Sequence, residues 1–444
     1  MLDQTMNYLI ENKIINENHV GGIPGLSPID VIENIHERLK ISKCTNTASI
    51  LISLDQTGAF SMINHSILLQ KINHIGFENS AINLIRSYLK DRQQLTYFNG
   101  SYSSLKPIGE NSSFQGTIMA TMWYVIYTLD QPAIIHMKCE HNYEDNSKCE
   151  KNISINFVDD NNSELTSTNW NRLKIDTEEF LENQNNYHDN NQLLLNEDKT
   201  VLMVNSKKKC YNNLTFKLKH KTIKHTKKFV LLGLVYNDKL NFYEHLNKGT
   251  NKKLSIITKI KLKRTLLRKI KYWLTKEEQI KYANAFIQGN LNYGISIWSK
   301  ENNKIIQKIE NLRVKVVKII IGNKIDDIEG NTNKLNQINW KTIEENSEIL
   351  ENTNIHRIMT SKRPILKYNK LTEDRNEHQI KYNNIKTQLR SGERYNKIPF
   401  YVRNKSIKNF KISYKHYRGD LKIIPRFVKI KNNERYTIIW PGIT

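Results

Sequence analysis

The chain has 444 residues, 38% of them hydrophobic and 9% aromatic, so it is long enough for two or three domains with apolar cores and is not disordered overall. Lys and Arg (68) outnumber Asp and Glu (44), and a formal net charge of +24 indicates a polyanionic partner, nucleic acid before an anionic membrane. Four cysteines are too few for a disulfide scaffold, the N-terminal residues lack a signal-peptide pattern, and no apolar run is long enough for a transmembrane helix. We therefore expect an intracellular protein, nuclear or cytoplasmic rather than secreted, without a membrane partner.

Helical and strand-like segments alternate over the first 135 residues. The segments with helical periodicity are 1–45, interrupted by a glycine-rich loop at 21–25, then 66–90, interrupted at Gly76, and 115–135, which ends near Pro132. The segments that predict strands are 47–55, which is rich in β-branched residues, and 93–100, which ends in an Asn99-Gly100 turn.

The rest of the chain continues this mixture and then becomes basic. Residues 153–167 predict two strands joined at the acidic pair Asp159-Asp160. Beyond them the sequence predicts a helix at 170–192, a strand at 200–205 and a single hairpin over 214–236. Residues 250–320 have helical periodicity and a very basic face, and the stretch 252–271 within them, with Tyr272 and Trp273 beside it, favours contact with a nucleic-acid backbone over a merely solvated surface.

Carboxylates at the ends of apolar strands are the feature that carries chemistry. Asp55 ends the first predicted strand, and Asp159 and Asp160 lie at the turn of the predicted hairpin. If these strands are neighbours in a sheet, the three carboxylates cluster at one edge, where like charges repel unless cations are present. Mg²⁺ prefers oxygen ligands, and two such ions stabilise the attacking and leaving oxygens of a phosphoryl transfer. An Asp-Asp pair alone is more often a turn or a helix cap, so the surrounding motifs decide.

The motifs around these carboxylates resemble the reverse transcriptase domain of non-LTR (LINE-like) retrotransposons, over about residues 5–322. The first palm motif of that family, an Asp followed by Ala-Phe and then Asp-His, reads LDQTGAFSMINH over residues 54–65, and its aromatic-x-Asp-Asp motif reads FVDD over residues 157–160. The resemblance implies that Phe60 excludes a 2′-hydroxyl and so selects dNTPs, and that two Mg²⁺ or Mn²⁺ ions are the cofactors. The residues that it makes catalytic metal ligands are Asp55, Asp159 and Asp160.

Three further motifs of the family are present in the expected order, one between these two and two after them. Its Gly-x-Pro-Gln-Gly loop reads SSFQG over residues 112–116, with Ser and Phe in place of Gly and Pro, and its Asn–Lys-Thr motif reads NEDKT over residues 196–200. The resemblance makes Lys199 a catalytic residue, a candidate general acid for the leaving pyrophosphate. It assigns nucleotide or template binding to Phe60, Gln115, Gly116 and Phe157, and a primer grip to a Leu-Gly pair within a strand, Leu232 and Gly233.

Together these observations predict an α/β right-hand polymerase with a palm centred on a small antiparallel sheet, partial fingers and a helical thumb. The expected domains are 1–240 for the partial fingers and palm, 241–322 for the helical thumb, and 323–444 for a basic C-terminal region of unknown role. The fingers are expected to be partial because the family has further strands ahead of the segment that resembles residues 5–16. The implied activity is an RNA-directed DNA polymerase, a nucleotidyltransferase whose partners are an RNA template, a DNA primer and dNTPs.

Two other functions remain open from the sequence. A catalytically degenerate or domesticated chain that keeps the reverse transcriptase fold would bind nucleic acid without synthesis, and the partial fingers motivate this alternative. A splicing cofactor similar to intron maturases shares the fold. The residues Tyr293-Gly294 and Trp298, however, are similar to the thumb signature of retrotransposons. The sequence gives no indication of the oligomeric state.

Overall fold

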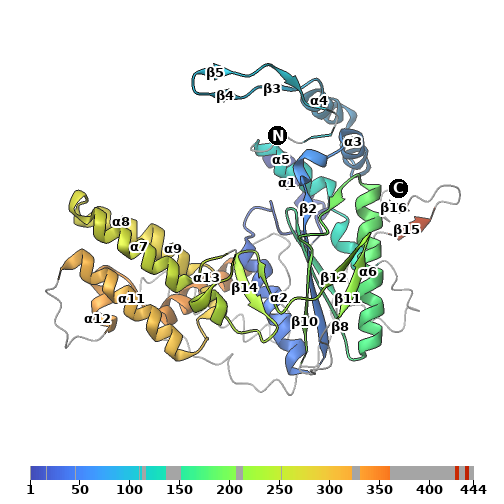
Figure 1. The fold of residues 1–444 in the computed structure, drawn as a ribbon. Helices are drawn as coiled ribbons and strands as arrows, with labels where there is room; N and C mark the ends of the chain where they lie inside the picture. Colours follow the sequence, from blue (N-terminus) through green and yellow to red (C-terminus); the bar gives the residue numbers. More distant parts are fainter. Residues whose placement is uncertain are drawn as a thin grey trace.

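Helices and short strands alternate as far as Asn237, and helices dominate from Ile256 to Thr360 (Figure 1). The computed structural model describes residues 2–16, 18–45, 47–109, 111–112, 117–136, 152–206, 214–251, 253–322, 331–360, 426–429 and 436–439. The fold is therefore a mixture of helix and sheet, as predicted. None of the helices in these ranges is long and apolar enough to cross a membrane.

A four-stranded antiparallel sheet lies at the centre of the molecule. Its spatial order is β10 (Val201–Asn205), β1 (Ala48–Leu54), β8 (Asp160–Ser167) and β7 (Ile153–Phe157). The strands predicted at 47–55, 153–167 and 200–205 are thus confirmed. Because β1 and β8 are antiparallel neighbours, the end of one lies beside the start of the other, and Leu54 pairs with Asn161.

One helix covers each face of this sheet (Figure 1). α2 (Pro28–Cys44) packs against Leu51, whereas α6 (Trp170–Asn190) packs against Ile50 and Ile52. Successive side chains of a strand point to opposite faces, so the uninterrupted apolar run of β1 is what a strand covered on both sides requires.

A second apolar core joins the N-terminal helix to three later ones. These helices are α1 (Leu2–Glu11), α3 (His65–His74), α4 (Asn79–Leu89) and α5 (Ile118–Tyr127). Gly76 separates α3 from α4 with a φ of +91°, so the predicted break is confirmed. The helix predicted over 115–135 is shorter than expected, because α5 ends at Tyr127 and a separate 3₁₀ turn, η2 (Gln131–His136), follows.

A two-stranded ribbon projects beyond α4 (Figure 1). Its paired segments are β3 (Gln93–Gln94) with β6 (Lys106–Pro107), and β4 (Tyr97–Phe98) with β5 (Ser101–Tyr102). The turn predicted at Asn99-Gly100 is confirmed, since both residues have positive φ, +47° and +84°. The prediction of one continuous strand over 93–100 is wrong, because pairing is interrupted between β3 and β4.

Two small hairpins follow β10 where a single hairpin was predicted over 214–236. They are β11 (Thr215–Leu218) with β12 (Lys221–Lys224), and β13 (Lys228–Leu231) with β14 (Leu234–Asn237). The prediction is wrong because each run contains its own turn position with positive φ, at Lys219 and at Leu232-Gly233. A short loop costs less closure entropy than a long one, so each run pairs with itself.

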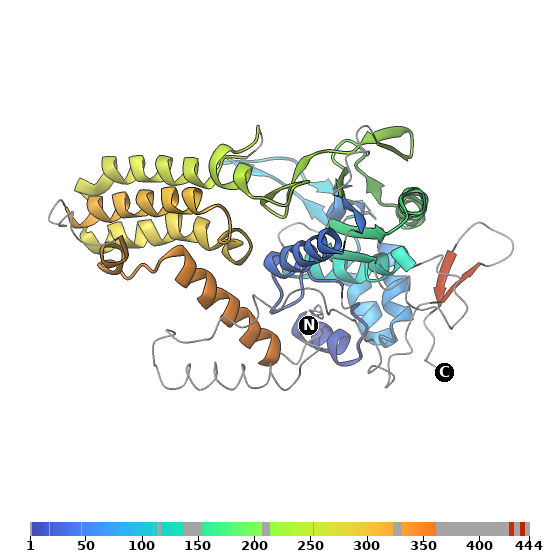
Figure 2. The ribbon, with the colours of Figure 1, turned by 90° about the horizontal axis from the view of Figure 1, so that it is seen from below.

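The helical region that follows forms a bundle beside the sheet (Figures 1 and 2). We call its members the helical bundle: α7 (Ile256–Ile270), α8 (Lys276–Ala283), α9 (Gly289–Asn292), α10 (Ile295–Trp298) and α11 (Asn303–Ile321). α12 (Asn331–Asn336) and α13 (Ile343–Thr360) come next, and two short strands, β15 (Arg426–Lys429) and β16 (Tyr436–Ile439), pair with each other. One apolar core runs from the α2 face of the sheet into the bundle.

Candidate active site

The turn between β7 and β8 consists of two residues, because Phe157 pairs directly with Asp160. The first of them, Val158, has a φ of +56°, a backbone region that a β-branched residue rarely adopts. Strain of this kind persists where surrounding contacts impose it, and it is concentrated at functional sites. The turn places Asp159 at the tip of the hairpin and Asp160 at the first position of β8.

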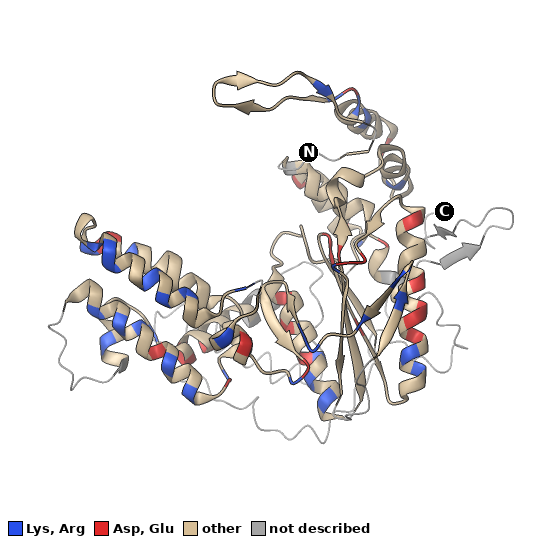
Figure 3. Ribbon diagram, viewed as in Figure 1, with Lys and Arg blue, Asp and Glu red and all other residues tan. Residues whose placement is uncertain are grey.

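Asp55 follows β1 immediately, beside the start of β8. The sheet order therefore brings the three predicted carboxylates, Asp55, Asp159 and Asp160, to one end of the central sheet. Figure 3 shows acidic segments at this end, close to the N-terminal helices. Phe157, predicted to contact the nucleotide or template, is half-buried against the core between the sheet and α2.

The three carboxylates influence one another electrostatically. Burial, with the nearby charges of Asp159 and Asp55, raises the pKa of Asp160 to about 6. Burial and Asp55 also raise the pKa of Asp159, while Lys199 acts in the opposite direction. Full ionisation of this group is therefore unfavourable, and a cation that neutralises it stabilises the fold.

Lys199 lies beside these carboxylates. Its Nζ is 3.3 Å from Oδ2 of Asp55, and the lysine side chain is 65% exposed. Asn196 shapes the loop that carries it: its backbone N–H donates to the carbonyl of Asp55 at 2.9 Å, and its Oδ1 accepts from the backbone N–H groups of Asp198 and Lys199. The Asn of the predicted motif thus builds the turn, and the Lys reaches the carboxylate.

The donor chemistry of this site suits a hard divalent cation, because carboxylate oxygens are the ligands that Mg²⁺ and Mn²⁺ prefer. Oδ2 of Asp55 is buried and accepts no hydrogen bond in the described part of the chain, since the contact with Lys199 is an ion pair without hydrogen-bond geometry. Within the described ranges, no three His, Cys, Asp or Glu side chains are already gathered as a metal site. A cation at Asp55 therefore competes with the Lys199 ammonium for the same oxygen.

Two residues that the sequence did not single out adjoin the carboxylates. The hydroxyl of Tyr124, on α5, donates to Oε1 of Gln56, the residue after Asp55. The pKa of Tyr124 is well above its usual value, chiefly because the side chain is buried and secondly because Asp159 is near. Phe60, the predicted gate, is half-buried, and its ring centroid lies 5.3 Å from that of Tyr124. The apolar run over 115–135 gave no sign that one of its tyrosines approaches the site.

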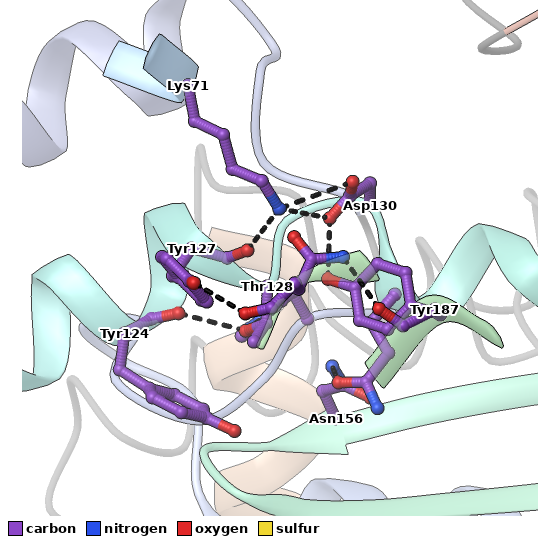
Figure 4. Close-up of polar contacts among 10 residues, drawn as sticks. Lys71, Tyr124, Tyr127, Thr128, Asp130, Asn156 and Tyr187 are labelled. Atoms are coloured by element: carbon purple, nitrogen blue, oxygen red, sulfur yellow. Dashed lines mark hydrogen bonds and ion pairs between the residues drawn. The ribbon is translucent and has the colours of Figure 1, made fainter. Parts of the chain in front are cut away.

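A buried polar cluster supports α5 and the segment after it (Figure 4). Nζ of Lys71 donates to the carbonyl of Tyr127 at 2.5 Å and lies 3.1 Å from Oδ1 of Asp130, which also accepts from the hydroxyl of Tyr187 at 2.7 Å. Because Asp130 is buried, its ion pair and hydrogen bond offset the cost of removing a carboxylate from water.

A second set of buried polar groups continues from this cluster to the strand before the acidic turn. Nε2 of His19 is 3.1 Å from the hydroxyl of Thr128, and the carboxamide of Gln131 accepts from Nδ2 of Asn156 at 2.9 Å. Asn156 in turn accepts from Nδ2 of Asn161 across the hairpin. These contacts fix the position of β7 and β8 just behind Asp159.

The loop between α1 and α2 lies along the edge of β7. The backbone N–H of Val20 donates to the carbonyl of Asn156 at 2.8 Å, and that of Asn156 donates to Asn18 at 2.9 Å. A Cβ added at Gly21 would lie 2.0 Å from the backbone N of Val158, so only glycine permits this approach. The glycine-rich loop predicted at 21–25 thus holds the acidic turn from behind.

The predicted primer-grip residues lie on a different hairpin. Leu232 and Gly233 form the turn between β13 and β14, with φ values of +40° and +91°, so the expectation that they lie within a strand is wrong. The carbonyl of Leu232 accepts from the hydroxyl of Tyr293, and that of Gly233 accepts from Nζ of Lys253. These contacts join the turn to the helical bundle. Gln115 and Gly116 lie outside the described residues.

A groove lined by lysines lies between α7 and α11. It has a volume of about 730 Å³, and its charged lining residues are Lys261, Lys304, Lys308 and Lys315. Amide side chains complete much of the polar lining, and none of these four lysines forms an ion pair with an acidic residue in the described parts of the chain. Figure 3 shows basic residues along both helices. Such a groove attracts phosphates.

No family model and no curated protein matches this sequence. Among solved structures, the chain is similar to apo telomerase from Candida tropicalis truncated from its C-terminal domain, at 16% identity and a TM-score of 0.37, over 53% of this chain and 42% of that one. It is also similar to telomerase from Candida tropicalis in complex with a TWJ fragment of telomeric RNA, at 13% identity and a TM-score of 0.39, over 87% and 56%. The chain thus spans about half the length of these telomerases, which are enzymes of the reverse transcriptase type. At such identities the likeness concerns at most the fold.

Proposed function

We propose that this chain is an RNA-directed DNA polymerase of the non-LTR retrotransposon type, in which the central sheet is the palm, the helices and ribbon around α3–α5 belong to the fingers, and the helical bundle is the thumb. The observation that carries the proposal is the meeting of Asp55, Asp159 and Asp160 at one end of the sheet, beside Lys199. Burial raises the pKa of two of these carboxyls, which is typical of groups that are poised for chemistry.

The reaction that fits this arrangement is nucleotidyl transfer. The 3′-oxygen of the primer attacks the α-phosphorus of a dNTP, the bond between that phosphorus and the pyrophosphate oxygen breaks, and the proton of the 3′-hydroxyl passes to a water molecule at the site. Two divalent cations, when bound, lower the pKa of the primer hydroxyl and neutralise the triphosphate. Asp55, Asp159 and Asp160 would hold them, because these are the half-buried carboxylates whose charges act on one another at the sheet end.

Lys199 and Phe60 have roles that follow from their positions. The Lys199 ammonium is mostly exposed at the rim of the carboxylate group, where it can give a proton to the leaving pyrophosphate or neutralise its charge. Phe60 packs against Tyr124 close to Asp55, where an aromatic ring can exclude a 2′-hydroxyl. Both roles depend on a nucleotide that binds at the carboxylates.

A specific observation favours a second candidate, a reverse transcriptase fold that binds nucleic acid without synthesis. Lys199 already neutralises Asp55, and the described residues hold no preassembled set of three metal ligands. In such a protein the basic groove would be the functional surface, and the acidic end of the sheet would be a relic held by an ion pair.

Primer extension on an RNA template, with Mg²⁺ and Mn²⁺ in separate reactions, distinguishes the two candidates. The wild-type chain should incorporate dNTPs, and Asp159→Ala should abolish incorporation while its affinity for the template–primer changes little. The matched control is Asp198→Ala, which removes an exposed carboxylate from the loop that carries Lys199.

Either of two results would reject the proposed carboxylate-dependent polymerase. Synthesis that is equal in wild type and Asp159→Ala would show that the carboxylates are not catalytic. Salt-sensitive RNA binding without any incorporation by the wild type, in either metal, would establish the second candidate instead.

A further inference from the structure

The projecting ribbon β3–β6 exposes an unusual amount of aromatic surface. Tyr97, Phe98 and Tyr102 are 61%, 81% and 70% exposed, and the neighbouring Leu95 and Leu105 are 46% and 60% exposed. Surfaces of soluble proteins rarely leave such side chains together in water unless the patch binds something. Neither the carboxylate site nor the basic groove uses them.

The ribbon is built to hold these rings in place. Tyr97 pairs directly with Tyr102 across the two strands, and their ring centroids are 4.8 Å apart. Phe98 is the next residue of the strand, so it points to the opposite face of the ribbon. The Asn99-Gly100 turn, with two positive φ values, matches the twist of the flanking strands and therefore stiffens the tip.

Charge decides which class of partner suits this surface. Residues 93–109 contain no Asp or Glu, and basic residues lie at the root of the ribbon (Figure 3). Arg92 there lies over the ring of Tyr88, and Lys90 is 3.6 Å from Asp91, which precedes the ribbon. The ribbon extends from α4 towards the helical bundle (Figures 1 and 2), at the end of the molecule where Figure 3 shows acidic segments of the sheet. The exposed rings of a segment that contains Lys106 and no Asp or Glu are suited to a nucleic-acid strand whose bases are unpaired.

We propose that the tip of the ribbon is a stacking platform for single-stranded nucleic acid, with Tyr97 and Tyr102 receiving a base on one face and Phe98 on the other. Stacking on an aromatic ring tolerates any base, because every base has a flat π-face, and it requires the base to be free of its complement. A duplex would gain nothing from these rings. The platform would take a strand that has not yet paired, and this role is separate from catalysis.

The test compares binding of a labelled single-stranded oligouridylate with binding of an RNA duplex, in the absence of dNTPs. The triple variant Tyr97→Ala/Phe98→Ala/Tyr102→Ala should lose at least about tenfold in affinity for the single strand. Its affinity for the duplex should equal that of the wild type. The salt dependence of binding should not change, because stacking releases no counterions. Tyr97→Phe/Tyr102→Phe should retain wild-type affinity, since it keeps both rings.

Leu95→Ala/Leu105→Ala is the matched control, because it removes exposed apolar side chains of the same ribbon without removing a ring. An equal loss of affinity in this control would overturn stacking in favour of general apolar contact. Phe98→Trp gives a readout that does not depend on the stability of the triple variant. The fluorescence that this variant has in excess of the wild type, whose chain already contains six tryptophans, should be quenched by the single strand and not by the duplex.

Two further results would overturn the proposal. The first is single-strand affinity that is unchanged in the triple variant. The second is a wild-type chain that self-associates through this ribbon, detected by sedimentation, with a triple variant that is monomeric and binds RNA normally. Neither result bears on the polymerase, which is tested by incorporation and by Asp159→Ala.

Discussion

The acidic end of the central sheet and the basic helical bundle handle charge in opposite ways. At the sheet, three half-buried carboxylates come from two neighbouring strands, and burial together with the charge of Asp55 raises the pKa of Asp159 and Asp160. Strand pairing and buried amides behind the turn fix the hairpin that carries these two residues. On the bundle, exposed lysines spread along α7 and α11 share one groove. Concentrated charge depends on every member and on its environment. Distributed charge is redundant, so we expect the affinity for nucleic acid to change little with one substitution and in proportion to the number of lysines removed.

The largest effect on the carboxylate site is expected from a substitution that displaces the turn between β7 and β8 and leaves every carboxylate in place. Gly21→Ala places a Cβ 2.0 Å from N of Val158 and 2.5 Å from C of Phe157, so the loop or the turn must shift. A misplacement near 1 Å costs on the order of a hundredfold in rate, and we expect kcat for primer extension to fall by about that factor. Affinity for the template–primer should stay near that of the wild type.

Gly109→Ala is the control for this experiment, because a Cβ there meets nothing within 4 Å. A folded Gly21→Ala protein with normal kcat would show that the turn does not need its support from the N-terminal loop.

Stability against pH tests whether the carboxylates are strained by one another. The pKa of Asp160 is about 6 in the folded chain and 3.8 without the fold, so its stabilising contribution is complete below pH about 4 and is lost as the pH rises through 6. Asp160→Asn should therefore raise the free energy of unfolding by about 1 to 3 kcal/mol at pH 7.5 and change little below pH 4. Urea unfolding without divalent cations, at a series of pH values, measures this.

Addition of Mn²⁺ sharpens the same comparison. It should stabilise the wild type more at pH 7.5 than at pH 5, since protons compete for the same oxygens, and it should stabilise Asp160→Asn less. If Asp160→Asn proves less stable than the wild type at pH 7.5 without divalent cations, the charge of Asp160 is already compensated within the protein, and the expected mutual repulsion is absent.

The bundle should respond in proportion to the charge removed. Lys304→Gln/Lys308→Gln/Lys315→Gln should lower the slope of log affinity against log salt by about 2 to 3 and weaken RNA binding roughly tenfold at low salt. Each single substitution should have about a third of that effect on the slope. The matched control is a triple change to Gln at exposed lysines of β11–β13, which are Lys217, Lys224 and Lys228. Equal slopes in the two triple variants would mean that the groove has no special role.

The smallest effect is expected at the loop that presents Lys199. Asn196→Ala removes an oxygen that accepts two backbone hydrogen bonds, at 3.1 Å from Asp198 and 3.2 Å from Lys199. A hydrogen bond of this kind contributes about 1 kcal/mol, so the rate of primer extension should fall roughly fivefold. Asn196→Asp keeps an acceptor and should lose much less. Equal losses in both variants would assign another role to this side chain.

Parts of the site were predictable because they depend on residues close together in the chain. An apolar run that ends on Asp55, and a two-strand pattern with Asp159 and Asp160 at the turn, both predict carboxylates at strand ends, and the strands formed as expected. The Leu232-Gly233 turn shows where such patterns fail. Residues 228–237 have the composition of one strand, and two consecutive positive φ values fold them into a hairpin.

The sequence by itself determined the net charge, the basic helices and the carboxylates at the ends of strands, because these follow from composition and short-range periodicity. Only the tertiary structure decided that β1 lies beside β8, that Gly21 supports the acidic turn, and that Tyr124 reaches the site from α5. It also decided the raised pKa of Asp160, which arises from burial. The physical reason is that strand neighbours, close backbone approach and desolvation depend on segments far apart in the chain, and no local pattern records which segments will meet.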